Sequence, residues 1–179
     1  MEYVVAFTLL VALGAWVVSA YLRLFHLYER VQGAWSRWSE ATRHRNECLG
    51  DFVQVFAAHL PQGDILPRDM RRWAADSARA LVAAPGAPRC GNLADLASVE
   101  RQLRRTLSHS VHTLETTQRM RDDARLQELC SAVSVALYRQ EELATFYNRS
   151  VAEYNTALAA PSGKLLGGLF GFCPVATVG

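Results

Sequence analysis

The feature that most constrains this chain is an uncharged run of 20 residues from Tyr3 to Leu22. As a helix that rises about 1.5 Å per residue, this run is long enough to cross the hydrocarbon core of a bilayer, which is about 30 Å thick. No proline or loop-like stretch follows it directly, and an amphipathic helical pattern begins at once. We therefore expect a transmembrane helix at 1–22 that continues as one rod into a helical domain.

Charges on either side of the run predict its orientation. Glu2 precedes the run, whereas five arginines follow it between Arg23 and Arg45. Because basic residues near a span favour the cytoplasmic side, we expect the N-terminus outside and the bulk of the chain inside. The alternative is a cleaved signal peptide, since the small residues at 18–20 resemble a cleavage site. The acidic start and the length of the run favour an uncleaved anchor.

Residues 23–160 carry apolar side chains at alternating spacings of three and four, and this pattern predicts helices that each bury one face. Breaks fall at Pro61, at 85–91, at the polar stretch 116–121 and at Pro161. No segment alternates with the period of a strand. The sequence therefore predicts four helices in this domain.

Residues that favour helix starts agree with these breaks. Pro67 and Asn92 are expected at the starts of the second and third helices, and Asp122 or Asp123 at the start of the fourth. The first and fourth helices are predicted to be long and the middle two shorter. We expect an all-α fold in which the transmembrane helix continues into an antiparallel up-down bundle. Four helices bring the chain back to its starting end, so a glycine-rich tail at 161–179 is expected near the membrane.

The four cysteines and the net charge exclude some classes of function. Cys48, Cys90, Cys130 and Cys173 lie far apart and form no C-x-x-C pair. In a cytoplasmic domain we expect them to be free thiols, with Cys130 buried on a helix. A formal net charge of +2 is too small to indicate a nucleic-acid partner.

A Tyr-Asn pair occurs twice on the last predicted helix, as Tyr147-Asn148 and Tyr154-Asn155. Seven residues are nearly two helical turns, so both pairs lie on almost the same face. The favoured interpretation is that the rings fill the core and each Asn hydrogen-bonds to a neighbouring helix. The alternative is a binding face on the bundle.

Arg45 lies on the apolar stripe of the first helix, which also carries Trp35. A buried arginine needs a carboxylate or several carbonyl partners, and the acids of the last helix, Glu141, Glu142 and Glu153, are candidates. The alternative is that Arg45 lies at the edge of the stripe and extends its charged group to water.

The tail combines glycines with large apolar side chains. These are Leu165, Leu166, Leu169, Phe170 and Phe172. Beside a bilayer, the tail could rest in the interface, and otherwise it would fold back over the end of the bundle. We expect it to pack on the bundle and to end close to the membrane.

The sequence carries little that indicates catalysis. His109 and His112 are three residues apart on the third predicted helix, but no acidic or cysteine partner accompanies them at metal-ligand spacing. The Glu-x-x-His signature of di-iron bundles is missing, as are a phosphate loop and the hydrolase and zinc-protease motifs. We expect no catalytic residues and no cofactor.

Motifs near the two ends of the chain resemble those of a known family. They are Ala34-Trp35-Ser36 with Arg43 and Arg45 after the anchor, the repeated Tyr-Asn pairs around Val151, and Pro161-Ser162 with 168–172 (Gly-Leu-Phe-Gly-Phe). With the N-terminal anchor, they resemble the LemA family from the anchor to Phe172. The middle of the chain, at about 60–114, is similar only in its helical character. The proline of the family's Leu-Ile-Pro-Asn element is missing at 48–51.

The resemblance implies a single-pass protein of the bacterial inner membrane with a cytoplasmic helical bundle and no established enzymatic activity. We therefore expect a non-enzymatic scaffold, adaptor or membrane-organising protein. Its expected partners are the lipid bilayer and an unidentified membrane or cytoplasmic protein, and it could also form oligomers. The alternative is a metal- or ligand-binding bundle that uses His109 and His112.

Overall fold

The computed structural model describes residues 1–84 and 93–178, and within these ranges the protein is helical and contains no strand. The described residues form six helices. They are α1 (Glu2–Ala58), α2 (Leu66–Ala83), α3 (Ala94–Thr116), α4 (Gln118–Arg121), α5 (Ala124–Ala159) and α6 (Pro161–Phe170). The expected all-α class is thus confirmed, with two short helices, α4 and α6, in addition to the four predicted.

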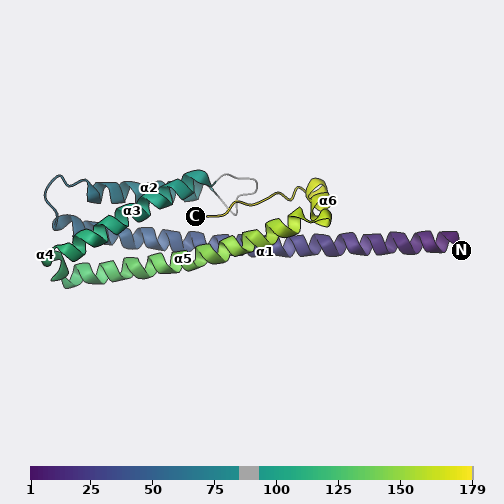
Figure 1. Ribbon diagram of the computed structural model, residues 1–179, viewed down its shortest axis with the longest axis horizontal. Coiled ribbons are helices and arrows are strands. Elements are labelled where there is room, and N and C mark those ends of the chain that lie inside the picture. The colour runs from purple at the N-terminus through teal and green to yellow at the C-terminus, as the bar shows by residue number, and fades with distance from the viewer. Residues whose placement is uncertain (85–92, 179) are drawn as a thin grey trace.

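The first helix, α1, is continuous over 57 residues, from the uncharged run into the rest of the molecule. This confirms the predicted rod. The helix ends at Ala58, where the N–H groups of His59 and Leu60 bond to the carbonyls of Phe56 and Ala57, and Pro61 follows directly. The N-terminal part of α1 projects beyond all other elements (Figure 1).

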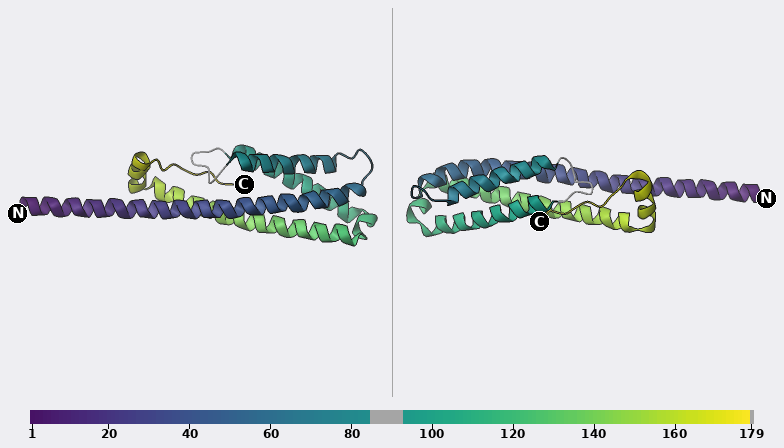
Figure 2. Two further views of the ribbon diagram at one scale, coloured as in Figure 1. Left: turned by 180° about the vertical axis from the view of Figure 1, so that it is seen from behind. Right: turned by 90° about the horizontal axis from the view of Figure 1, so that it is seen from above.

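The two longest helices, α1 and α5, pack against each other along most of α5 (Figures 1 and 2). The shorter α2 packs against both α1 and α3, and α4 links α3 to α5. The predicted contrast between long outer and shorter middle helices is therefore present, since α5 has 36 residues, α2 has 18 and α3 has 23.

Local sequence explains several helix starts. Pro67 and Asp69 lie in the first turn of α2, where a missing N–H is harmless and a negative charge is favoured. Asp123 caps α5, because its side chain accepts hydrogen bonds from the N–H groups of Arg125 at 2.9 Å and Leu126 at 3.1 Å. The expected cap of the third helix, Asn92, lies outside the described residues, as does the predicted break at 85–91.

Two hydrophobic clusters fill the interior along the axis of α1. The first lies next to the projecting part of α1 and the second at the far end. The first includes Leu24, Val31, Trp35, Trp38, Tyr147, Val151, Tyr154 and Leu158. The second includes Leu49, Phe52, Phe56, Met70, Leu103, Leu107, Leu126 and Val133. Apart from Leu24, these residues lie on the faces for which the helical spacing predicts burial.

The chain turns sharply between α5 and α6. The prediction that the long helix ends at Pro161 is close, because α5 stops at Ala159, but Pro161 also begins a new helix. Gly163 makes this turn possible, since a Cβ there would lie 2.2 Å from the carbonyl oxygen of Ala157. Only glycine fits so close to the preceding helix.

Candidate functional site

The two Tyr-Asn pairs of α5 hold a non-helical C-terminal segment, residues 172–178, that runs back along the bundle from α6 (Figure 1). We call the four side chains of Tyr147, Asn148, Tyr154 and Asn155 the Tyr-Asn ladder. All four bond to main-chain atoms of the segment. The ladder is therefore a site at which side chains of a helix bind a peptide backbone.

Each asparagine pairs with both main-chain groups of a single residue. The Asn155 amide donates to the carbonyl of Val175 at 2.9 Å and accepts from the Val175 N–H at 3.0 Å. Asn148 repeats this arrangement with Val178, at 2.7 Å and 2.9 Å. A side-chain amide here offers a donor and an acceptor side by side, as a neighbouring strand would.

The tyrosines add two hydrogen bonds and bury their rings. The Tyr147 hydroxyl donates to the carbonyl of Ala176 at 2.8 Å, and the Tyr154 hydroxyl donates to that of Cys173 at 3.1 Å. Both rings are almost fully buried. Burial, with a smaller contribution from Tyr28, raises the pKa of Tyr147 well above its ordinary value of 10, so its hydroxyl stays a donor.

The spacing of the ladder matches an extended chain. Asn148 and Asn155 are seven residues apart, which corresponds to about 10.5 Å along a helix. Their partners Val178 and Val175 are only three residues apart, and three fully extended residues also span about 10 Å. The segment must therefore be nearly extended where it crosses the ladder.

The structure corrects one part of the prediction for these pairs. The rings lie in the core, as the packing interpretation expects, but neither asparagine bonds to a neighbouring helix. Both bond to the C-terminal segment instead. Trp35 supports the ladder from α1, since its ring lies 5.5 Å from that of Tyr147 and 5.1 Å from that of Trp38.

Arg45 is buried at the centre of a polar cluster that joins four helices. Its guanidinium donates to Glu100 of α3 at 2.9 Å, to Gln140 of α5 at 2.8 Å and to Ser77 of α2 at 3.1 Å. Only 1% of Arg45 is exposed. The interpretation in which its charged group reaches water is therefore wrong.

The predicted partners of Arg45 are also wrong. Glu141 pairs with the exposed Arg104, and Glu153 pairs with Arg30. The carboxylate that neutralises Arg45 comes from Glu100 of α3 instead. Burial acts to raise the pKa of Glu100, but hydrogen bonds from Arg45, Ser77 and Gln140, together with the charge of Arg45, lower it below its ordinary value of 4.5.

The apolar tail divides into buried and exposed side chains. Leu166 packs into the first hydrophobic cluster, and Phe172 is partly buried against it. Leu165, Leu169 and Phe170 are exposed by 63%, 76% and 55%. Thus the tail packs on the bundle through one face of α6 and leaves three large apolar side chains uncovered.

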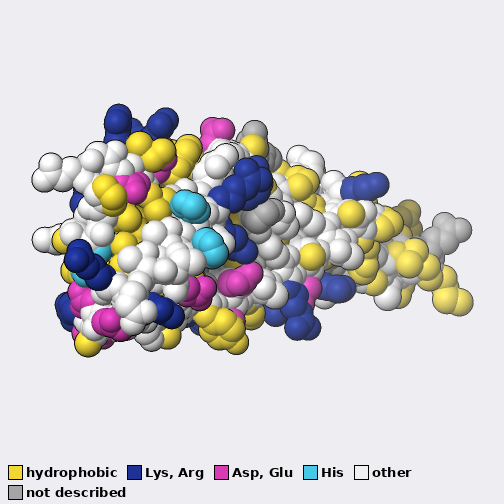
Figure 3. Space-filling model, turned by 60° about the vertical axis from the view of Figure 1, so that its left-hand side comes forward, with side chains coloured by type: hydrophobic (Ala, Val, Ile, Leu, Met, Phe, Trp, Pro, Cys, Tyr) yellow, Lys and Arg dark blue, Asp and Glu magenta, His cyan; other side chains and the backbone are white. Residues whose placement is uncertain are grey.

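The tail lies beside the uncharged run of α1. Tyr21, at the end of that run, contacts Phe170 and Phe172, with ring centroids 5.0 Å and 5.8 Å apart. Most of the run is uncovered: its most apolar stretch has no buried residue, and only Val17, Ala20 and Tyr21 near its end are partly buried against the first cluster. In Figure 3, hydrophobic side chains cover the receding end of the molecule, whereas charged side chains gather over the bundle.

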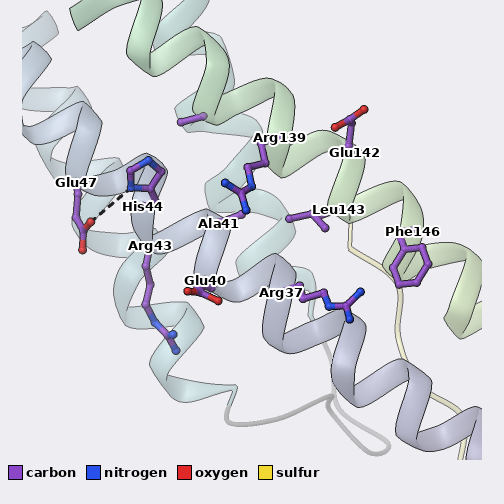
Figure 4. Close-up of a pocket in the computed structure, with 11 residues that line it drawn as sticks. Arg37, Glu40, Ala41, Arg43, His44, Glu47, Arg139, Glu142, Leu143 and Phe146 are labelled. Carbon is purple, nitrogen blue, oxygen red and sulfur yellow. Dashed lines mark ion pairs between the residues drawn. The ribbon is translucent and has the colours of Figure 1, made fainter.

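A groove of about 800 Å³ lies between α1 and α5 on the bundle surface. Figure 4 shows charged side chains along both of its walls, with Leu143 near its middle and Phe146 at one end. The residues from α1 are Arg37, Glu40, Ala41, Arg43, His44 and Glu47, and those from α5 include Arg139 and Glu142. His44 and Glu47 lie 3.8 Å apart.

His109 and His112 are both exposed on α3. Among the residues that the structure describes, no group of three or more His, Cys, Asp or Glu side chains is placed to hold a metal ion.

The cysteines differ in state. Cys48 and Cys130 are free, as expected. Cys130 is only partly buried, although the sequence predicts a buried thiol, and this burial raises its pKa. Cys173, at the start of the C-terminal segment, is disulfide-bonded, so the expectation of a free thiol is wrong there. Cys90 lies outside the described residues. Sequence spacing gave no signal for this bond, since the fold-back of the chain after α6 decides what Cys173 can reach.

Comparison of the sequence with protein-family models gives no match, and comparison with curated proteins gives none. The resemblance to the LemA family therefore stays a prediction from its motifs.

Proposed function

We propose that this protein is a single-pass, membrane-anchored helical bundle of the bacterial inner membrane that acts as a non-enzymatic scaffold or adaptor, similar to the LemA family. The observation that carries the proposal is the continuity of α1. Its apolar part, mean hydropathy 2.1, is uncovered, and the same helix then supplies one wall of the core. A helix built in this way holds the bundle rigidly at the membrane surface.

The distance between membrane and bundle is set by adjacent residues of α1. Leu22 is the last residue of the uncharged run and is exposed, whereas Leu24 and Tyr28 are buried in the first cluster. Less than one helical turn therefore separates the lipid-facing surface from the bundle core. We propose that α2, α3 and α5 complete an antiparallel up-down bundle on this rod, which the lengths of α1 and α5 support.

A second membrane contact is proposed for α6. The exposed Leu165, Leu169 and Phe170 lie on the helix that packs against Tyr21, at the end of the uncharged run. Apolar side chains at this level would enter the interface between headgroups and acyl chains. The tail would thus fix the tilt of the bundle relative to the bilayer.

For orientation we propose the N-terminus outside and the bundle in the cytoplasm, because the basic residues follow the run. The disulfide of Cys173 favours the opposite side, since disulfides are rare in the cytoplasm. Reporter fusions at the two ends of the full chain decide between them. A C-terminal reporter that is active only outside the cytoplasm would overturn the proposed orientation.

Membrane extraction tests the anchor. The wild-type protein should stay in the membrane fraction when membranes are washed at alkaline pH, and its mass should be that of the full chain. The double variant Leu10→Arg/Leu13→Arg should be released into the soluble fraction, because each charge in a span costs about 3 kcal/mol. Val82→Arg with Val135→Arg is the matched control, since both valines are exposed elsewhere. Loss of about 20 residues from the wild-type mass would establish the cleaved signal peptide instead.

The adaptor role is tested at the groove between α1 and α5. A photo-crosslinking residue at Glu40 or Arg139 of the full chain should capture a defined protein in native membranes, and a fragment without the anchor should lose it. The same crosslinker at Val82, outside the groove, is the control. Equal capture from both positions, or capture that does not depend on the anchor, would contradict the proposal.

A further inference from the structure

We propose that the Tyr-Asn ladder is a binding site for an extended peptide segment of a partner protein, and that residues 172–178 are its resident competitor. The inference deepens the proposed adaptor function, because it names the kind of partner segment that the bundle would recognise. It rests on the contacts between α5 and the segment.

The ladder recognises a backbone rather than particular side chains. The six hydrogen bonds described between the ladder and the segment all involve main-chain carbonyl or N–H groups of the segment. Proteins that bind unrelated extended peptides rely on the same kind of contact, usually at the edge of a sheet. Here the side-chain amides of Asn148 and Asn155 supply the donors and acceptors that an edge strand would otherwise supply. Other sequences that can extend in the same way could therefore make the same bonds.

Selectivity would come from two side chains of the ligand. Val175 and Val178 are 4% and 6% exposed and belong to the first hydrophobic cluster, whereas Pro174 and Thr177 face solvent. The ligand is thus an extended segment with small aliphatic residues three apart, each with a free N–H. Of the two positions between them, that of Thr177 is exposed and tolerates a polar side chain, whereas that of Ala176 packs against the first cluster and calls for a small one.

The resident segment can leave without unfolding a helix. It follows α6 through Gly171, whose φ of 71° makes the change of direction, and it contributes no helical turn of its own. Cys173 is held by a disulfide, so reduction removes one restraint on the segment. Because the segment is tethered, a partner peptide must compete with a high local concentration.

Peptide binding to the full chain in detergent, under reducing conditions, tests the proposal. The probe is a fluorescent peptide with the sequence of 172–178 and Ser in place of Cys173. Val175→Lys with Val178→Lys in the protein displaces the resident segment. The peptide should bind this variant at least about tenfold more tightly than wild type, where the site is mostly occupied.

A second probe tests backbone recognition. Methylation of the two valine amide nitrogens of the peptide removes the donors to Asn148 and Asn155 and leaves the side chains unchanged. Binding to the Val175→Lys/Val178→Lys variant should fall at least about tenfold. Adding Asn148→Ala and Asn155→Ala to this variant should abolish binding of the unmethylated peptide. Adding Arg149→Ala instead should leave that binding unchanged, because Arg149 is an exposed neighbour.

Three results would overturn the proposal. The first is that the Val175→Lys/Val178→Lys variant has the helical content and melting temperature of wild type but does not bind the peptide. The second is that this variant binds the methylated and unmethylated peptides equally well. The third is a wild-type dimer that exchanges its segments, because the occupant would then be a second copy. If the double variant unfolds, a protease site inserted after Gly171 and cut in the folded chain frees the segment instead. No bilayer is present in the assay, so its outcome is independent of the membrane anchor.

Discussion

The guanidinium of Arg45 and the carboxylate of Glu100 form an ion pair between α1 and α3, and the arginine is 99% buried. Gln140 and Ser77 bond to the same two groups, so α2 and α5 join the cluster. The pair lies along α1 between the two hydrophobic clusters, after Trp38 and before Leu49. It therefore fixes how four helices align at one level of the bundle.

Removal of one partner should be costly. Arg45→Met leaves the Glu100 carboxylate without its cation, and loss of one member of a buried pair typically costs about 3–5 kcal/mol. We expect a clear drop in the free energy of unfolding of the full chain in detergent, followed by far-UV circular dichroism in urea. Arg104→Met, which removes the exposed pair with Glu141, is the control and should change little.

Replacement of both partners should be much milder. Arg45→Met combined with Glu100→Leu removes both charges and keeps similar volume, so most of the lost stability should return. A double variant that is as unstable as Arg45→Met alone would show that the bonds to Gln140 and Ser77, rather than the charge pair, hold the helices together.

Stability should fall in acid because of Glu100. Its pKa in the folded protein lies below the ordinary 4.5, so the carboxylate adds stability above pH 4.5 and loses it as the pH falls through the folded value. We expect the stability difference between wild type and Glu100→Gln to be constant near neutral pH and to shrink below about pH 4.5. Melting temperatures of both proteins between pH 7 and pH 3 measure this.

Elements with a strong period were predictable from the sequence. The uncharged run leads directly into the helical stripe through Val31, Trp35 and Trp38, with no proline or loop-like stretch between them. Accordingly, α1 is continuous over both. A cap at Asp122 or Asp123 was predictable because a short acidic side chain at a helix start accepts free N–H groups, and the structure has it at Asp123. Periodicity and capping are local, so they can be read without knowledge of the fold.

The candidate site was predictable only in part. The Tyr-Asn repeat marked the correct face of α5, but its ligand, 172–178, is an irregular segment without a period. The partner of Arg45 was missed because acids on α3 and α5 are equally suitable until the relative rotation of the helices is known. The packing of the helices brings Glu100 to Arg45 and leaves Glu141 on the surface, where it pairs with Arg104.

The turn between α5 and α6 should depend on Gly163. A methyl group there would lie 2.6 Å from the Leu158 carbonyl oxygen and closer still to that of Ala157, so backbone must move. Gly163→Ala should lower the melting temperature of the full chain and loosen α6, as seen by faster proteolysis after Lys164. Gly168→Ala is the matched control: it has open space around it and should be neutral or slightly stabilising, since alanine favours helix.

The proposed membrane contact of α6 predicts where a spin label meets lipid. With Cys48 and Cys130 replaced by Ser, the label is placed at Leu169→Cys in the full chain reconstituted into liposomes. We expect it to collide more often with oxygen, which partitions into lipid, than with a water-soluble nickel complex, because Leu169 is exposed beside the end of the uncharged run. The same label at Val135→Cys, an exposed position on α5, should show the opposite preference. Equal profiles at the two positions would place α6 in water and leave α1 as the membrane contact.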